Sequence, residues 1–120
     1  MITEYKEKYY FLSRRFFSRF EIEGKTFETV DKAYEYYVKE EYTNEENTML
    51  LHYLYKATLA KFNQNLFLQD KLLKIDPKKF DVEDDYGNVL YLVHETIARA
   101  KKIKEAEEES KTLFGLKILE

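Results

Sequence analysis

The stretch at residues 11–42 constrains the fold most, because a tight-turn signal is followed at once by a helical pattern. Short alternating apolar runs flank Gly24, which can adopt the positive φ that a two-stranded hairpin turn requires. Thr29 is a suitable N-cap for the helix that follows. Apolar residues then recur at helical spacing, at Val30, Ala33, Tyr34, Tyr37 and Val38. We therefore expect a β-hairpin that leads directly into a helix over about residues 30–42.

Three further helices are predicted by the spacing of apolar residues along the rest of the chain. Their expected ranges are about 48–62, 66–75 and 89–109. Pro77 follows the second of these, and an acidic loop precedes the last one. The predicted fold class is therefore α+β and mostly α. We expect a single compact domain over residues 1–120, with about four helices and a small β-hairpin.

An apolar tail follows the charged run that ends the last predicted helix. Residues 111–120 contain five large apolar side chains, at Leu113, Phe114, Leu116, Ile118 and Leu119. Because a group of this size is rarely left in water, we expect the tail to be buried. It either docks back on the domain, with a strand as one option, or forms a contact between the chains of a homo-oligomer.

Composition excludes several classes of protein. The chain has no Cys, which excludes a disulfide framework, thiol catalysis and a Cys-based zinc site. The acidic loop lacks the residue order of a calcium loop, and we expect no metal and no cofactor. A net charge of −3 argues against general nucleic-acid binding. Neither a secretory signal nor a membrane-spanning run is visible, so we expect a cytoplasmic protein with no membrane partner.

Three blocks, in order, resemble the NADAR domain, a family of small α-rich proteins that act on ADP-ribose-type nucleotides. Phe11-Leu12-Ser13, Gly24-Lys25 and Val30-Asp31 fit the family's opening pattern of Phe-Leu-Ser-Asn, Gly and Val-Glu-His without a gap. The second block is Ala60-Lys61-Phe62-Asn63-Gln64-Asn65, and the weaker third block is Gly87-Asn88-Val89-Leu90. The resemblance implies a compact NADAR-like domain. Its nucleotide pocket would lie beside the opening loop, the segment that begins with Phe11-Leu12-Ser13.

The resemblance also implies which residues form that pocket. Asp31 falls where the family has its catalytic Glu, and a carboxylate there could stabilise an oxocarbenium-like cation or activate water. Arg14 replaces the family's pocket Asn and could grip a diphosphate through its guanidinium fork. Each residue also has a purely structural explanation, such as a favourable helix dipole or ordinary surface charge. The implied ligand-binding residues are Phe11, Ser13, Arg14, Glu35 and Asn88, and the implied catalytic residue is Asp31.

Several departures from the family bear on function. The chain has Asp for Glu at position 31, Arg for Asn at position 14, no Trp, and a short connection between its first two helices. These changes favour binding of an ADP-ribose-type nucleotide, such as ADP-ribose or a cyclic ADP-ribose signal, by a viral anti-defence sponge of the kind a phage could use. The alternative is an active N-glycosidase that cleaves an ADP-ribosyl bond. A third interpretation is a partner-binding protein with a relict pocket.

Overall fold

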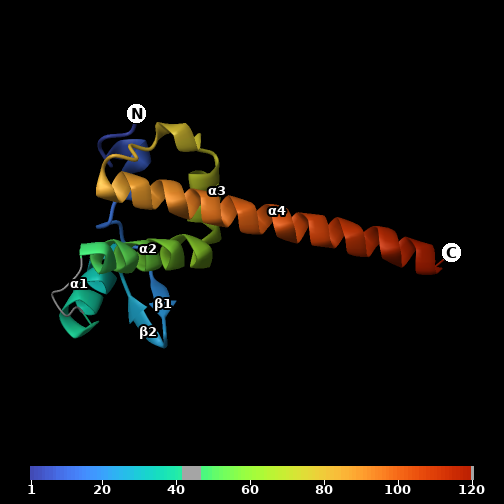
Figure 1. The fold of residues 1–120 in the computed structure, drawn as a ribbon, viewed down its shortest axis with the longest axis horizontal. Coiled ribbons are helices and arrows are strands. Elements are labelled where there is room, and N and C mark those ends of the chain that lie inside the picture. Colours follow the sequence, from blue (N-terminus) through green and yellow to red (C-terminus); the bar gives the residue numbers. More distant parts are fainter. Residues whose placement is uncertain (42–46, 120) are drawn as a thin grey trace.

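The computed structural model describes the backbone of residues 1–41 and 47–119 and the side chains of residues 1–40 and 49–110. This described part contains four α-helices and a two-stranded antiparallel hairpin, which confirms the predicted, mostly helical fold class (Figure 1). The elements, in chain order, are the 3₁₀ helix η1 (Glu7–Leu12), strands β1 (Phe20–Ile22) and β2 (Lys25–Phe27), helices α1 (Val30–Glu41), α2 (Asn47–Gln64) and α3 (Leu66–Leu73), the 3₁₀ helix η2 (Pro77–Lys79), and α4 (Asp85–Leu119).

The hairpin turns where the sequence predicts. Phe20 of β1 lies opposite Phe27 of β2 in an antiparallel register. Glu23 and Gly24 connect the strands with φ values of 52° and 81°, and two positive values in succession match the right-handed twist of paired strands. The register directs Phe20, Ile22 and Phe27 to the same side, where all three are buried. The hairpin therefore contributes one apolar face to the core.

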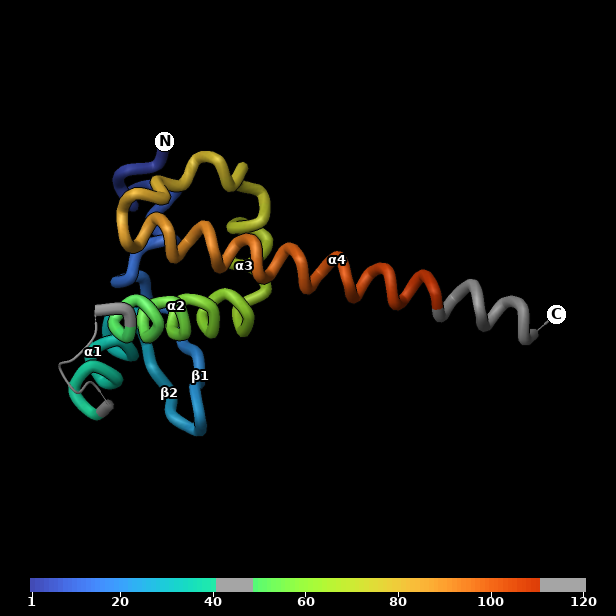
Figure 2. The backbone as a smooth tube through the Cα atoms, viewed as in Figure 1, coloured from blue at the N-terminus to red at the C-terminus, as the bar shows by residue number. Residues whose placement is uncertain are grey.

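Helix α2 is the platform on which the other elements pack. It contacts α1 and β1 on one side and α4 on the other, and α3 contacts it at its C-terminal end (Figures 1 and 2). Apolar residues that recur at helical spacing supply the buried faces of these helices. The buried residues include Val30, Ala33 and Tyr37 of α1, Tyr53, Leu54, Ala57 and Phe62 of α2, and Val89, Leu90, Val93 and Ile97 of α4.

Helix α4 begins earlier than the sequence predicts. The carboxylate of Asp84 accepts a hydrogen bond from the backbone N–H of Gly87 at 2.9 Å, and the backbone carbonyl of Asp84 accepts one from Asn88. Asp84 therefore caps the helix, and Asn88 lies within its first turn. Of the acidic residues that the sequence assigns to a loop, Asp85 lies in the first turn, where a carboxylate is favoured by the helix dipole.

Helix α4 also ends later than predicted. It continues to Leu119, so the expected helix end near residue 109 and the option of a strand after it are both wrong. Residues 101–109 are mostly Lys, Glu and Ala, which are strong helix formers, and no proline interrupts them. Burial on the core-facing side stops at Ile97, and residues 101–110 are exposed in a segment that projects from the domain (Figure 1). The expected burial of residues 111–120 lies outside the described side chains.

The N-terminal segment is attached to the chain just before α4. Ile2 forms a parallel bridge with Phe80, and its backbone N–H donates to the carbonyl of Lys79 at 2.7 Å. Both apolar side chains of the bridge are buried. Residues 3–6 are thereby held beside the opening loop. None of the helices in the described part combines the length and apolarity needed to span a bilayer.

Gly87 provides a test of this packing. A Cβ atom at this position would lie 2.1 Å from the backbone carbonyl oxygen of Asp81, so the turn before α4 would have to move. We expect Gly87→Ala to lower the free energy of unfolding by about 1–3 kcal/mol, although Ala is the better helix former. Urea unfolding measures this change. An equal or higher stability of the variant would contradict the close approach.

Candidate functional site

The candidate site lies where η1 passes into the loop that follows it, and the backbone at this junction is held from α2 and α4. Lys61 of α2 is fully buried, and its Nζ donates to the carbonyl oxygens of Phe11 at 2.6 Å and Ser13 at 3.1 Å. The hydroxyl of Tyr86, from the first turn of α4, donates to the carbonyl of Leu12. Three consecutive carbonyls are therefore bonded by side chains of two core helices. This fixes the point at which Arg14, the next residue, leaves the loop.

Burial changes the acid–base properties of both groups that hold the loop. Desolvation lowers the pKa of the Lys61 amine to about 7. The amine lies 4.9 Å and 5.3 Å from the ring centroids of Phe62 and Phe16, and such cation–π contacts compensate part of the lost hydration. Desolvation also raises the pKa of the Tyr86 phenol well above its ordinary range. Tyr86 therefore stays protonated and acts as a hydrogen-bond donor at physiological pH.

Arg14 and Asp31 meet between this loop and the start of α1. Arg14 Nε donates to Asp31 Oδ1 at 2.6 Å, and the backbone N–H of Asp31 donates to the carbonyl of Arg14 at 3.0 Å. Arg15 Nε lies 3.9 Å from Asp31 Oδ2. Thr29 Oγ1 accepts from the backbone N–H of Lys32 at 3.1 Å, so it caps α1 as predicted and fixes Asp31 in the first turn. The side chains of Arg14 and Asp31 remain 35% and 28% exposed, which keeps the pair accessible to a ligand.

Two cavities share Arg14 and Tyr86. The first, the arginine cavity, measures about 560 Å³ and lies between the N-terminal segment, the loop and α1. The second, the leucine cavity, measures about 480 Å³ and lies between α1, α2 and the start of α4. The remaining lining residues of the arginine cavity are Thr3, Glu4, Tyr5, Lys6, Ser13, Arg15 and Asp31, and those of the leucine cavity are Tyr34, Leu50, Leu51, Leu54, Asp84 and Asp85.

The guanidinium of Arg14 stands at the boundary between the two cavities. Its Cζ lies 4.9 Å from the ring centroid of Tyr34 and 6.0 Å from that of Tyr86, distances that suit cation–π contact. One cavity therefore has a cationic, polar lining and the other an apolar, aromatic lining with two carboxylates at its edge. Together they can accept an anionic group next to a flat apolar one. No group of three or more His, Asp or Glu in the described part could hold a metal ion.

The structure brings together some of the residues that the sequence predicts for the site. Ser13, Arg14 and Asp31 line one cavity. Phe11 is buried in the core, where its ring meets that of Phe62 edge-on at a centroid distance of 6.3 Å. Glu35 is exposed on α1, and Asn88 lies half-buried in the first turn of α4; both are outside the linings of the two cavities.

The sequence alone predicts no site role for Lys61, Tyr34 or Tyr86. Tyr34 fits the apolar stripe of α1, so nothing in the sequence separates it from a core residue. Lys61 had a usable signal, because it is a cation within the apolar run of α2 that ends at Phe62. The partner of Tyr86 is a backbone carbonyl 74 residues away, and such a contact leaves no local pattern.

The second block of the NADAR resemblance forms structural contacts around the site. The side chain of Gln64 accepts from the backbone N–H of Glu21 at 2.7 Å and donates to its carbonyl at 2.6 Å. Asn65 donates to the carbonyl of Lys61 at 2.7 Å and to that of Arg19 at 3.4 Å. The block therefore attaches both the hairpin and the opening loop to the end of α2.

Comparison of the chain with protein-family models, with curated proteins and with solved structures found no match. The NADAR resemblance therefore stays a prediction from the sequence. Any functional conclusion depends on the geometry and charge of the two cavities.

Lys61 makes stability depend on pH. Because the pKa of the buried amine is about 7, below its ordinary value of 10.5, the unfolded chain binds the proton more tightly between these values. The contribution of this group to the free energy of unfolding should therefore rise with pH from about 7, by up to ~1.4 kcal/mol per pH unit. Lys61→Met, which removes the charge but keeps an unbranched side chain of similar length, should lose this rise.

Urea unfolding over a pH series from about 7 to 9 measures the slope, and Tyr86 stays protonated throughout this window. The exposed Lys39 offers a matched control, since Lys39→Met should keep the wild-type slope. If Lys61→Met and the wild type showed parallel pH profiles, the amine would be charged in the folded protein at these pH values.

Proposed function

We propose that the protein binds an ADP-ribose-type nucleotide across the two cavities and holds it without cleaving it. The observation that carries the proposal is the position of Arg14, whose guanidinium borders both a cationic cavity and an apolar one. A nucleotide of this kind has matching parts, with an anionic diphosphate beside a flat base and hydroxyl-rich ribose. A cleft with an apolar wall and a few convergent polar groups is the usual form of a small-molecule site.

The arginine cavity suits the diphosphate. Two guanidinium groups, of Arg14 and Arg15, face the single carboxylate of Asp31, so this cluster keeps a positive charge for an anion. Guanidinium groups bind phosphate oxygens through paired hydrogen bonds. Ser13 Oγ accepts a hydrogen bond from the backbone N–H of Arg15 at 3.1 Å. The hydroxyl proton of Ser13 therefore points away from this N–H group. That proton is then able to reach a phosphate oxygen.

The leucine cavity suits the base and a ribose. Leu50, Leu51 and Leu54 form an apolar wall, and the ring of Tyr34 lies on the opposite element. A purine can stack on such a ring and bury its faces against the leucines. Asp85 is exposed at the edge of the same cavity, where its carboxylate can accept hydrogen bonds from ribose hydroxyls.

The ion pair of Asp31 favours capture over cleavage. In an N-glycosidase the carboxylate would have to stabilise a developing cation or activate water. Here one carboxylate oxygen accepts from Arg14 at 2.6 Å, and the guanidinium of Arg15 is near the other. The positive charges of Arg14 and Arg15 would repel the cation that develops on the sugar during cleavage. Capture without turnover is also what a cytoplasmic anti-defence sponge for a nucleotide signal requires, so we assign that role to the site.

Arg14→Ala tests the binding site. Losing a charge-assisted hydrogen bond costs about 1.5–3 kcal/mol, and the exposed carboxylate of Asp31 would then repel the phosphates. Affinity for the nucleotide should therefore fall about tenfold or more. Calorimetry with ADP-ribose, cyclic ADP-ribose isomers and NAD measures this loss. Arg19→Ala is the matched control, because Arg19 is exposed nearby and lines neither cavity, and it should bind as the wild type does.

Asp31→Asn separates capture from N-glycosidic cleavage. Chromatography after incubation with the same nucleotides should recover them intact from the wild type, and Asp31→Asn should not weaken binding, because it relieves Arg14 of its ion pair. Release of a free base by the wild type, lost in Asp31→Asn with binding retained, would establish the N-glycosidase instead. If no nucleotide of the panel bound at all, the third interpretation, a partner-binding protein, would replace both.

A further inference from the structure

The linings of the two cavities differ in charge. The arginine cavity has three cationic side chains and two carboxylates. The leucine cavity has two carboxylates, of Asp84 and Asp85, and a single cationic group, the guanidinium of Arg14. That guanidinium is itself paired with Asp31 at 2.6 Å. The lining of the leucine cavity is therefore negative, and the part of a nucleotide that enters it meets carboxylates at the start of α4.

The two carboxylates are not neutralised by cations of the domain. Among the described side chains, those of residues 1–40 and 49–110, no ion pair includes Asp84 or Asp85. The carboxylate of Asp84 accepts from the backbone N–H of Gly87 and stays at the helix cap. Asp85 is exposed in the first turn, and its carboxylate makes no hydrogen bond to another described residue. Asp85 is therefore the carboxylate that is available to a ligand.

The 2′ oxygen of the adenosine ribose is a position at which a carboxylate can distinguish nucleotides. In dinucleotides this oxygen carries either a free hydroxyl or a phosphate ester. The hydroxyl can donate a hydrogen bond to a carboxylate, and the charge of the acceptor strengthens that bond. A phosphate ester adds a charge of about −1.5 to −2 near pH 7, so a carboxylate repels it. In the doubly wound α/β fold, a carboxylate likewise accepts from the 2′-hydroxyl.

We propose that Asp85 makes the leucine cavity selective for nucleotides with a free 2′-hydroxyl on the adenosine ribose, and against their 2′-phosphorylated forms. The inference rests on the proposed function, because it takes the diphosphate to lie in the arginine cavity and the adenosine in the leucine cavity. Arg14 then binds the diphosphate, and the lining of the leucine cavity has no other cation for a second phosphate. The ligand is thus an ADP-ribose-type nucleotide derived from NAD and not from NADP.

Calorimetry with ADP-ribose and its 2′-phosphate, and with NAD and NADP, tests the selectivity. The wild type should bind the form with the free hydroxyl at least about tenfold more tightly, because the phosphorylated form meets two carboxylates. Asp85→Asn should weaken binding of ADP-ribose about threefold or more, since a neutral acceptor replaces a charged one. The same variant should strengthen binding of the 2′-phosphate. Opposite changes of the two affinities distinguish a selective contact from a folding defect, which would weaken both.

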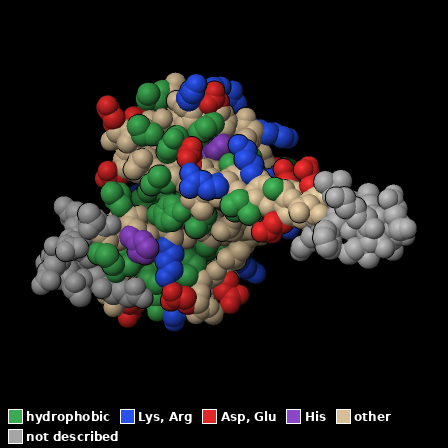
Figure 3. Space-filling view, turned by 45° about the vertical axis from the view of Figure 1, so that its right-hand side comes forward, with side chains coloured by type: hydrophobic (Ala, Val, Ile, Leu, Met, Phe, Trp, Pro, Cys, Tyr) green, Lys and Arg blue, Asp and Glu red, His purple; other side chains and the backbone are tan. Residues whose placement is uncertain are grey.

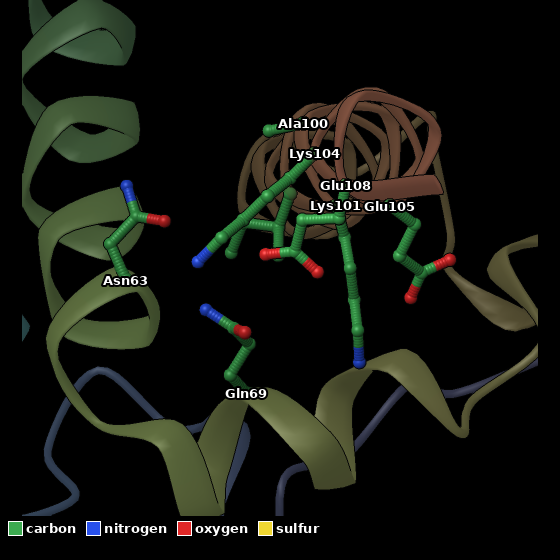
Figure 4. Close-up of a pocket in the computed structure, with 8 residues that line it drawn as sticks. Asn63, Gln69, Ala100, Lys101, Lys104, Glu105 and Glu108 are labelled. Carbon is green, nitrogen blue, oxygen red and sulfur yellow. The ribbon is translucent and has the colours of Figure 1, made fainter. Parts of the chain in front are cut away.

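A matched control comes from the projecting part of the same helix. The space-filling view shows acidic side chains next to the grey end of α4 (Figure 3). Glu105 is exposed on this part of the helix and lines a separate cleft of about 370 Å³, which Asn63 and Gln69 border on the other side (Figure 4). None of the residues that line this cleft lines either cavity. Glu105→Gln removes the same charge as Asp85→Asn, and it should keep both affinities of the wild type.

Equal binding of the two forms by the wild type would overturn this inference and leave the proposed function intact, because a nucleotide would still be captured. A ratio of the two affinities that stays unchanged in Asp85→Asn, or that shifts as much in Glu105→Gln, would overturn the role of Asp85. Asp85→Lys gives the reverse test, since the new cation should favour the 2′-phosphate. If no member of either pair bound, the proposed function would fail, and the selectivity with it.

Discussion

The candidate site depends on the two hydrogen bonds that the buried amine of Lys61 donates. The amine donates from within the core to the carbonyls of Phe11, in η1, and Ser13, at the start of the loop. A charge in that position is costly unless it is well hydrogen-bonded. These hydrogen bonds therefore fix the position of the loop relative to α2. The position of Arg14 follows from this contact, because the residue directly after the bonded carbonyls has little freedom in where its side chain begins. The surface site is thus determined by the interior of the domain.

Helix α2 links the remaining elements in a similar way. Its end attaches the hairpin through Gln64, its middle packs on α1 and α4, and its first turns form the leucine wall of one cavity. Leu54 belongs both to the buried core and to this wall, so core packing and the cavity share a residue of one helix. A substitution in its core would therefore alter the cleft as well as the stability of the fold.

The fold was largely predictable from the sequence, whereas the site was only partly so. Helical periodicity and the turn at Gly24 are local patterns, and the cap at Thr29 follows from a local preference. The meeting of Arg14 and Asp31 was expected only through the NADAR resemblance. Tyr86 joins residues distant in sequence, so no local pattern reveals it. The C-terminal limit of α4 differs from the prediction because the charged run at residues 101–109, which contains neither Pro nor Gly, favours helix and does not end it.

The continuity of α4 has a mechanical consequence. The helix starts at the wall of the two cavities, which Tyr86 lines, and from Asn88 to Ser110 it contains neither Pro nor Gly, the residues at which helices usually bend. It can therefore act as a lever arm. With a rise of 1.5 Å per residue, a tilt of ~5° at the cavity end would displace the backbone of Ser110 by about 3 Å. An adjustment at the cleft too small to change its own contacts would be amplified at the far end of the molecule.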